Sequence, residues 1–176
     1  NRCTVRVWKD VCEAVDEGDE AAEWFSALIG RPLRLVRFAS DGVRHADPLF
    51  ARDDYAPVKF SDAYPVLVTQ IASLAAHPLR STVTLFVLAG LTPFDEDHID
   101  RLRVRDVVLR LAKPSTRCIV TTTDQETGTR GVEPLPALRK LRWNRKLQGV
   151  TFGENATVLQ PGALRVGDTV EVTYRR

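Results

Sequence analysis

The sequence predicts a strand-dominated α+β domain, built on a curled or barrel-like sheet with two or three helices. Short segments rich in β-branched and apolar residues recur along the chain and are separated by turn residues. Only two or three segments place apolar residues at helical spacing. The 176 residues are enough for one sizeable domain and too few for two, so we expect a single domain over residues 1–176.

The first third of the chain predicts two strands with a helix between them. Residues 4–8 alternate polar and apolar side chains, as a half-buried strand does. Asp19 is suited to cap the following helix, and Gly30 stands where that helix would end. Residues 33–38 predict a strand, and the polar residues 40–57, with two prolines, predict a loop. The helix itself is indicated by apolar residues at helical spacing, namely Ala21, Ala22, Phe25, Leu28 and Ile29.

The middle of the chain continues this alternation of short elements. Residues 66–69 predict a short apolar strand, and residues 70–76 a short helix. Residues 82–88 are β-branched and apolar, which is typical of a buried strand. The acidic residues 95–97 suit a turn or the first turn of a helix. Residues 101–111 alternate and predict a hairpin or a bent strand.

The last third predicts two more strands and a basic helix. Residues 118–123 predict a strand, which the turn-like residues 124–128 would end. Residues 134–147 are basic and predict a helix. Gly167-Asp168 predicts a turn before the last strand, residues 169–174.

The composition excludes several classes of protein. It is 44% hydrophobic and 27% charged, which is ordinary for a soluble globular chain. No apolar run approaches the roughly 20 residues that span a bilayer, and no secretory leader opens the chain. A net charge of +2 does not argue for nucleic acid or membrane. We therefore expect a cytoplasmic protein without a membrane span.

The cysteine, histidine and methionine contents limit the chemistry further. Three cysteines without a CxxC pair argue against a disulfide framework and a structural zinc site. The three histidines are scattered, so a histidine-based metal site has little support. The sequence contains no methionine, so we expect Asn1 not to be an initiator and further sequence to precede it.

Cys118 is the residue with the clearest chemical potential. It stands at a predicted loop-to-strand junction, where the positive charge of Arg117 favours its thiolate form. Thr116 offers a hydroxyl and an amide nearby, and a thiolate is a soft metal ligand. The alternative is a small buried cysteine that packs like a hydrophobic residue, which is the more common fate of a lone cysteine.

Two further features have both a functional and a structural interpretation. Asp62 precedes a strand that begins with Pro65, so its carboxylate could accept a hydrogen bond from a ligand or close an Asx turn. The basic residues 139–146 could bind an anion or nucleic acid. We favour a solvated helix face there, with Leu138, Leu141 and Trp143 touching the core, because the chain is nearly neutral.

Together these residues resemble the MOSC domain, in the branch of the mitochondrial amidoxime-reducing component and its bacterial hydroxylaminopurine-detoxifying relatives. The resemblance covers almost the whole chain, and its most specific part is the block from Arg117 to Asp124 with the distant Gly167-Asp168. The later matching residues are Thr127-Gly128, Glu133-Pro134-Leu135, Leu138-Arg139 and Phe152-Gly153-Glu154-Asn155. The earlier ones are Val7-Trp8, Asp16, Gly18-Asp19, Ala22, Trp24-Phe25, Arg34-Leu35-Val36, Phe60-Ser61-Asp62, Pro65, Ala72-Ser73-Leu74 and Pro93-Phe94-Asp95-Glu96-Asp97.

The resemblance implies a strand-rich, barrel-like MOSC fold that binds the molybdenum cofactor (molybdenum–molybdopterin). It makes Cys118 the protein ligand to molybdenum and therefore the catalytic residue. It places Asp62, Ala63 and Tyr64 along the pterin, and Thr116 and Arg117 beside the ligand. The implied reaction is the two-electron reduction of amidoximes, hydroxylamines and N-oxides, with the electrons supplied by a separate donor protein.

Three departures from the family pattern define the alternative. Residues 81–85 replace an Arg-Phe-Arg-Pro-Asn stretch whose Arg and Asn contact the cofactor in the family. Ser115 stands where the family often has a second cysteine, and we expect the family's upstream β-rich domain to be absent. The alternative is a degenerate MOSC domain that binds the cofactor, or carries sulfur on Cys118, without turnover. A nucleic-acid binder acting through residues 139–146 is a third hypothesis, which we do not favour.

Overall fold

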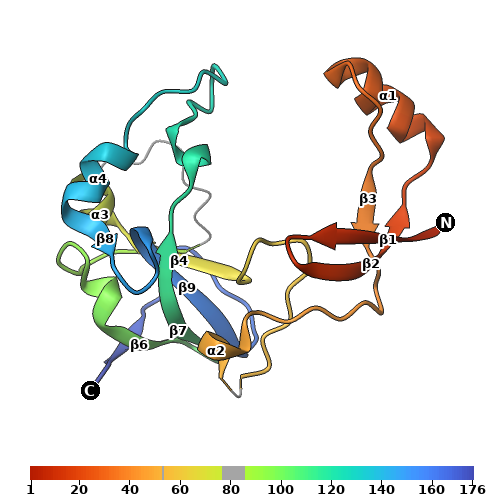
Figure 1. Cartoon of the computed structure of the whole chain (residues 1–176). Coiled ribbons are helices and arrows are strands. Elements are labelled where there is room, and N and C mark those ends of the chain that lie inside the picture. The colour runs from red at the N-terminus through yellow and green to blue at the C-terminus, as the bar shows by residue number, and fades with distance from the viewer. Residues whose placement is uncertain (53, 77–85) are drawn as a thin grey trace. The chain divides into compact units, whose positions relative to one another are not determined.

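The computed structural model describes residues 1–52, 54–76 and 86–176 (Figure 1). It is the strand-rich α+β fold that the sequence predicts, with few helices and a curled sheet. The chain forms two compact units. Unit 1 comprises Asn1–Asp47 and Pro57–Ala63, and unit 2 comprises Pro48–Ala56 and Tyr64–Arg176. The prediction of one domain over residues 1–176 stays a prediction.

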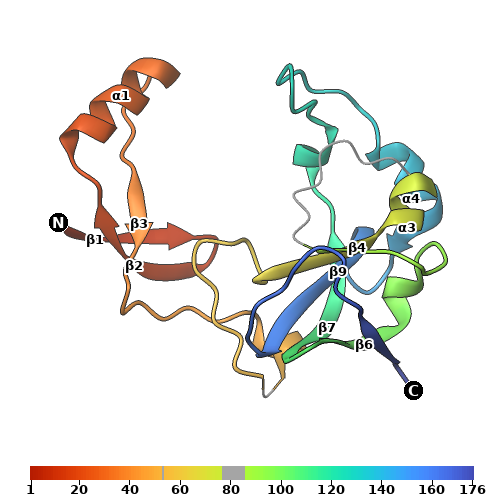
Figure 2. The ribbon, with the colours of Figure 1, turned by 180° about the vertical axis from the view of Figure 1, so that it is seen from behind.

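Unit 1 contains a three-stranded antiparallel sheet with the order β1-β2-β3 (Figure 2). The strands are β1 (Arg2–Val7), β2 (Asp10–Asp16) and β3 (Val36–Phe38). β1 and β3 confirm the two predicted strands, whereas β2 has no counterpart in the sequence analysis. β1 and β2 form a hairpin whose turn places Trp8 in the left-handed region, at φ 55°.

The helix of unit 1, α1 (Asp19–Ile29), confirms the prediction apart from its cap. Gly18 is the N-cap residue, so the prediction of Asp19 in that role was wrong. Asp19 is instead the first residue of the helix, and its carboxylate pairs with the guanidinium of Arg34 at 2.9 Å. Gly30 ends the helix in the left-handed conformation, as expected.

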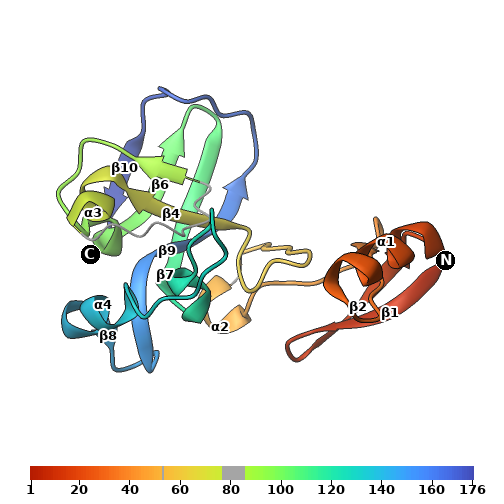
Figure 3. The ribbon, with the colours of Figure 1, turned by 90° about the horizontal axis from the view of Figure 1, so that it is seen from above.

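Unit 2 is organised by a seven-stranded sheet that curls into a half-barrel (Figure 3). Six strands follow the order β10-β6-β7-β9-β4-β5, and β8 pairs with β9. All the pairings are antiparallel except that of β4 with β5. The strands are β4 (Val66–Gln70), β5 (Phe86–Leu88), β6 (Ile99–Val104), β7 (Val107–Thr116), β8 (Trp143–Asn144), β9 (Gly149–Gln160) and β10 (Glu171–Tyr174).

The centre of this sheet is the pair β7 and β9, and it carries the main core. β6 and β7 form the predicted hairpin, with Arg105 in the left-handed region at its turn. β9 was not predicted, although it lies between β7 and β4. The core beside it consists of buried aliphatic side chains, Val66, Val68, Leu88, Ile99, Leu102, Val107, Leu109, Leu111 and Ala156.

Short helices of unit 2 surround the sheet. They are α2 (Pro48–Ala51), α3 (Ile71–Ala76), α4 (Leu135–Arg142) and the 3-10 turns η1 (Asp95–His98) and η2 (Ile119–Thr122). α3 and η1 confirm their predictions, whereas α2 lies inside residues 40–57, where we expected only loop. α4 ends at Arg142, earlier than predicted, because the chain enters β8. A second core cluster joins Leu138, Val150 and Phe152.

Two predicted strands differ from the structure or lie partly outside the described residues. The strand predicted over residues 118–123 was wrong, because η2 occupies this segment. The hydroxyls of Thr121 and Thr122 donate to the carbonyls of Cys118 and Ile119 at 2.8 Å, and these bonds favour a turn over a ladder. The strand predicted over residues 82–88 is observed from Phe86, and residues 82–85 lie outside the described residues.

Candidate functional site

Cys118 lies directly beyond the central strand β7. The backbone N–H of Arg117 donates to the carbonyl of Val150 at 2.8 Å, which fixes the chain against β9 just before the cysteine. Cys118 is then the N-cap residue of η2, in an extended conformation. Thr116 pairs with Thr151 across the sheet. Cys118 therefore lies on a short, hydrogen-bonded turn that follows the C-terminal end of the central strand β7.

The thiol of Cys118 is exposed, whereas Cys12 is buried and Cys3 is partly buried. The alternative interpretation, a cysteine that packs like a hydrophobic residue, therefore describes Cys12 and not Cys118. An exposed thiol at the end of a strand is free to reach a ligand. Its role as a metal ligand stays a prediction.

Arg117 is the nearest cation to this thiol in sequence, and its guanidinium is only partly hydrogen-bonded within the described residues. Its Nε has no hydrogen-bond partner within the described residues. Its Nη1 donates a long bond of 3.3 Å to the hydroxyl of Ser115. Among the described residues Arg117 forms no ion pair. Burial lowers the pKa of Arg117, while the charge of Cys118 acts in the opposite direction.

A partly buried cation without a carboxylate costs free energy unless an anion lies against it. The thiolate of Cys118 is one such anion, and a phosphate or another anionic ligand group is a second. The arrangement of Arg117 and Cys118 is therefore suited to an anionic ligand.

The segment after η2 folds back onto it and confirms the predicted turn. Asp124 accepts bonds from the backbone N–H groups of Glu126 and Thr127 at 3.0 and 2.9 Å. The N–H of Gly131 then returns to the carbonyl of Thr122 at 2.8 Å. These bonds hold the turn that carries Cys118 from its C-terminal side.

The remaining predicted site residues fall in both units. Asp62 and Ala63 belong to unit 1, and Tyr64 belongs to unit 2, where it is buried. The carboxylate of Asp62 accepts the indole N–H of Trp8 at 3.2 Å, a partner that we did not anticipate. The roles of these three residues in cofactor binding stay predictions.

The basic segment over residues 139–146 is partly engaged within unit 2. Arg142 pairs with Asp97 at 2.6 Å, and Arg139 lies over the ring of Trp143 at 4.7 Å. Leu138 is fully buried, as expected, whereas Leu141 is 68% exposed, so the expectation that it touches the core was wrong. The engagement of Arg142 and Arg139 removes part of the charge that a nucleic-acid interface would use.

Two buried carboxylates of unit 2 were not recognised in the sequence. Glu96 and Glu154 are both fully buried. Burial is the main cause that raises the pKa of each, and that of Glu154 reaches about 8 although Arg175 lies 2.9 Å away. The available signal was a single acidic residue, Glu154, within a stretch that is otherwise free of charge from Gly149 to Gln160.

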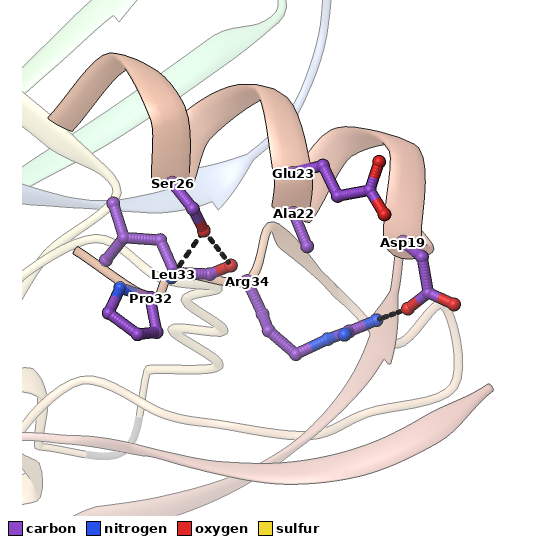
Figure 4. Close-up of a pocket in the computed structure, with 7 residues that line it drawn as sticks. All are labelled: Asp19, Ala22, Glu23, Ser26, Pro32, Leu33 and Arg34. Atoms are coloured by element: carbon purple, nitrogen blue, oxygen red, sulfur yellow. Dashed lines mark hydrogen bonds and ion pairs between the residues drawn. The ribbon is translucent and has the colours of Figure 1, made fainter. Parts of the chain in front are cut away.

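Unit 1 holds an open pocket of about 580 Å³ between α1 and residues 32–34 (Figure 4). Its polar groups already bind one another. Arg34 pairs with Asp19, and the hydroxyl of Ser26 exchanges bonds with the backbone of Leu33 at 2.9 and 3.2 Å. None of the predicted site residues lines it, so it carries no functional argument.

The described residues contain no group of three or more histidine, cysteine or acidic side chains placed to hold a metal ion. A metal held by a single protein thiolate and otherwise by an organic cofactor requires no such group. No helix within the described ranges is long and apolar enough to cross a membrane.

Unit 2 thus combines a curled sheet, an exposed cysteine beyond its central strand, and an arginine that forms no ion pair among the described residues. The sequence profile of the MOSC domain matches residues 56–171. The chain belongs to the MOSC domain family.

Curated proteins show the same relationship. The chain is 32% identical to mitochondrial amidoxime-reducing component 1 of Homo sapiens, over 90% of this chain and 52% of that protein. It is 31% identical to the Danio rerio protein of the same name, over 96% of this chain and 57% of that protein. It is 27% identical to the molybdenum cofactor sulfurase of Drosophila grimshawi, over 97% of this chain and 23% of that protein. The chain spans about half the length of the amidoxime-reducing components.

Proposed function

We propose that this domain binds the molybdenum cofactor through the thiolate of Cys118 and reduces N-hydroxylated compounds. The observation that carries the proposal is the exposed thiol of Cys118, next in sequence to Arg117, whose Nε has no hydrogen-bond partner among the described residues, within the region that matches the MOSC family. The names of the amidoxime-reducing components support the reaction.

The residues present fit such a cofactor. A soft thiolate suits a sulfur-ligated metal, and Arg117 offers unused donors to an anionic ligand. We assign Thr116 to the same edge, where its side chain is exposed. Asp62, Ala63 and Tyr64 remain our proposed pterin contacts on the family resemblance. The cofactor, when bound, supplies the exchange of two electrons and the acceptance of an oxygen atom.

The proposed reaction balances with an external donor of electrons. An amidoxime takes up two electrons and two protons, its N–O bond breaks, and an amidine and water are formed. The electrons come from a separate donor protein, as the amidoxime-reducing relatives imply. The chain's own contribution is to hold the cofactor at Cys118, to neutralise its charge with Arg117 and to present an open edge to the substrate.

The test is the reduction of benzamidoxime by the cofactor-loaded protein, with reduced methyl viologen as electron source. We expect benzamidine to form, and Cys118→Ser to lower the rate by at least about 100-fold, because a direct metal ligand is removed. Cys3→Ser is the matched control and should retain the rate, since Cys3 lies in the sheet of unit 1. Equal rates in the Cys118→Ser and wild-type proteins would overturn the assignment.

A second candidate is a cofactor-binding or sulfur-carrier module without turnover. It is favoured by residues 81–85, which lack the family's Arg and Asn, and by the similarity to a molybdenum cofactor sulfurase. Intact mass spectrometry distinguishes the two candidates. A persulfide on Cys118 in protein that holds no molybdenum would favour the carrier, and reduction of benzamidoxime would exclude it.

A further inference from the structure

The two residues after Cys118 expose large aliphatic side chains to solvent. Ile119 is 55% exposed and Val120 is 63% exposed. We call these two residues, Ile119 and Val120, the apolar rim.

The hydrogen bonds of η2 explain why Ile119 and Val120 point outward. The hydroxyls of Thr121 and Thr122 bond back to the carbonyls of Cys118 and Ile119, and both threonines are buried. Because the second half of the turn packs inward, the first half is left at the surface. The turn therefore presents the thiol and two aliphatic side chains consecutively.

The residue before Cys118 and the two residues after it differ in chemical character. Arg117, before the cysteine, is a cation whose Nε is buried and unpartnered, so it suits an anionic group. Ile119 and Val120, after it, carry no charge and no hydrogen-bonding side-chain group. Binding of a neutral, apolar group over Ile119 and Val120 is favourable in free energy, because it removes apolar surface from contact with water.

We propose that the apolar rim binds the apolar substituent of the substrate, so that the domain prefers aryl and long-chain alkyl N-hydroxylated compounds over small polar ones. This inference rests on the proposed function, since it takes Cys118 as the place where the substrate's N–O group reacts. The occupant is the hydrocarbon part of a neutral small molecule, whose N-hydroxylated end would lie toward Cys118.

The first experiment follows binding without turnover. In cofactor-loaded protein with labelled Ile and Val methyl groups, benzamidoxime is titrated and compared with acetamidoxime. We expect saturable shifts of the Ile119 and Val120 methyls with benzamidoxime and small shifts with acetamidoxime. The exposed methyls of Val166 are the internal control and should not move. Equal shifts at Val166, or none at the apolar rim, would overturn the inference.

The second experiment measures specificity. Ile119→Ser and Val120→Ser should each raise KM for benzamidoxime about threefold to tenfold, because a few methyl groups leave the contact. KM for acetamidoxime should change less than about twofold, and Val166→Ser should change neither. If the wild type reduces both compounds and the variants leave the ratio of KM for benzamidoxime to KM for acetamidoxime unchanged, the inference about the apolar rim fails and the proposed function stands. If the loaded wild type reduces neither compound, the proposed function fails with it.

Discussion

Glu154 makes the stability of unit 2 dependent on pH in an unusual direction. Its side chain is fully buried on β9, and its ion pair with Arg175 does not offset the loss of water around the carboxylate. Glu96 and Asp97 add to the effect, since their negative charges also favour the protonated form. Burial thus raises the pKa of Glu154 from 4.5 to about 8.

The raised pKa fixes the sign and the size of the effect. A carboxyl whose folded-state pKa exceeds its unfolded value contributes full stability below the unfolded pKa, near 4.5. That contribution is lost as the pH rises from about 4.5 to about 8. The shift corresponds to a loss on the order of 5 kcal/mol in the free energy of unfolding. Glu154→Gln resembles the protonated acid and should abolish most of this pH dependence.

Urea unfolding at pH 5 and at pH 8.5 measures the effect. Trp143 reports unit 2 by fluorescence in a Trp8→Phe, Trp24→Phe background, because the other two tryptophans lie in unit 1. We expect Glu154→Gln to match the parent at pH 5 and to exceed it by several kcal/mol at pH 8.5. Glu171→Gln, at an exposed position of β10, is the control. A Glu154→Gln variant that is less stable than the parent at pH 8.5 would refute the reasoning.

Two further predictions concern the strand and the cation beside the candidate site. Gly153→Ala should destabilise the protein by about 3 kcal/mol, because φ is +72° and the added Cβ would lie 2.7 Å from the Val68 carbonyl oxygen. Gly128→Ala is the control, since Gly128 has a similar φ of +68° but open space around it. It should cost only about 1 kcal/mol in the same urea titration. Arg117→Gln should weaken retention of molybdenum about 10- to 100-fold on dialysis, with Arg117→Lys intermediate, and unchanged retention in both variants would contradict the role given to this cation.

The sequence predicted the hairpin β6–β7, α1, α3 and β4, because their apolar periodicity and turn residues are local signals. It did not predict β9, the strand at the centre of the sheet. β9 is buried along most of its length, so it lacks alternation, and Gly149, Gly153 and Glu154 interrupt its apolar run. Pro114 is likewise tolerated within β7 because the register with β9 shifts on both sides of it.

The position of Cys118 followed from its resemblance to a family, but its surroundings did not. Its exposure depends on η2, whose threonine bonds override the strand preference of a β-branched run. The backbone of Arg117 bonds to Val150 of β9, a long-range contact that no local pattern encodes. The same holds for Asp62, whose partner Trp8 is 54 residues away in the sequence.

Molybdenum per chain, measured by elemental analysis, tests the central claim most directly. The protein is expressed in a host that makes the cofactor, as wild type, Cys118→Ala and Cys3→Ala. The account predicts close to one molybdenum per chain in the wild type and in Cys3→Ala, and almost none in Cys118→Ala. Absence of the metal from the wild type, or its full retention by Cys118→Ala, would contradict the account.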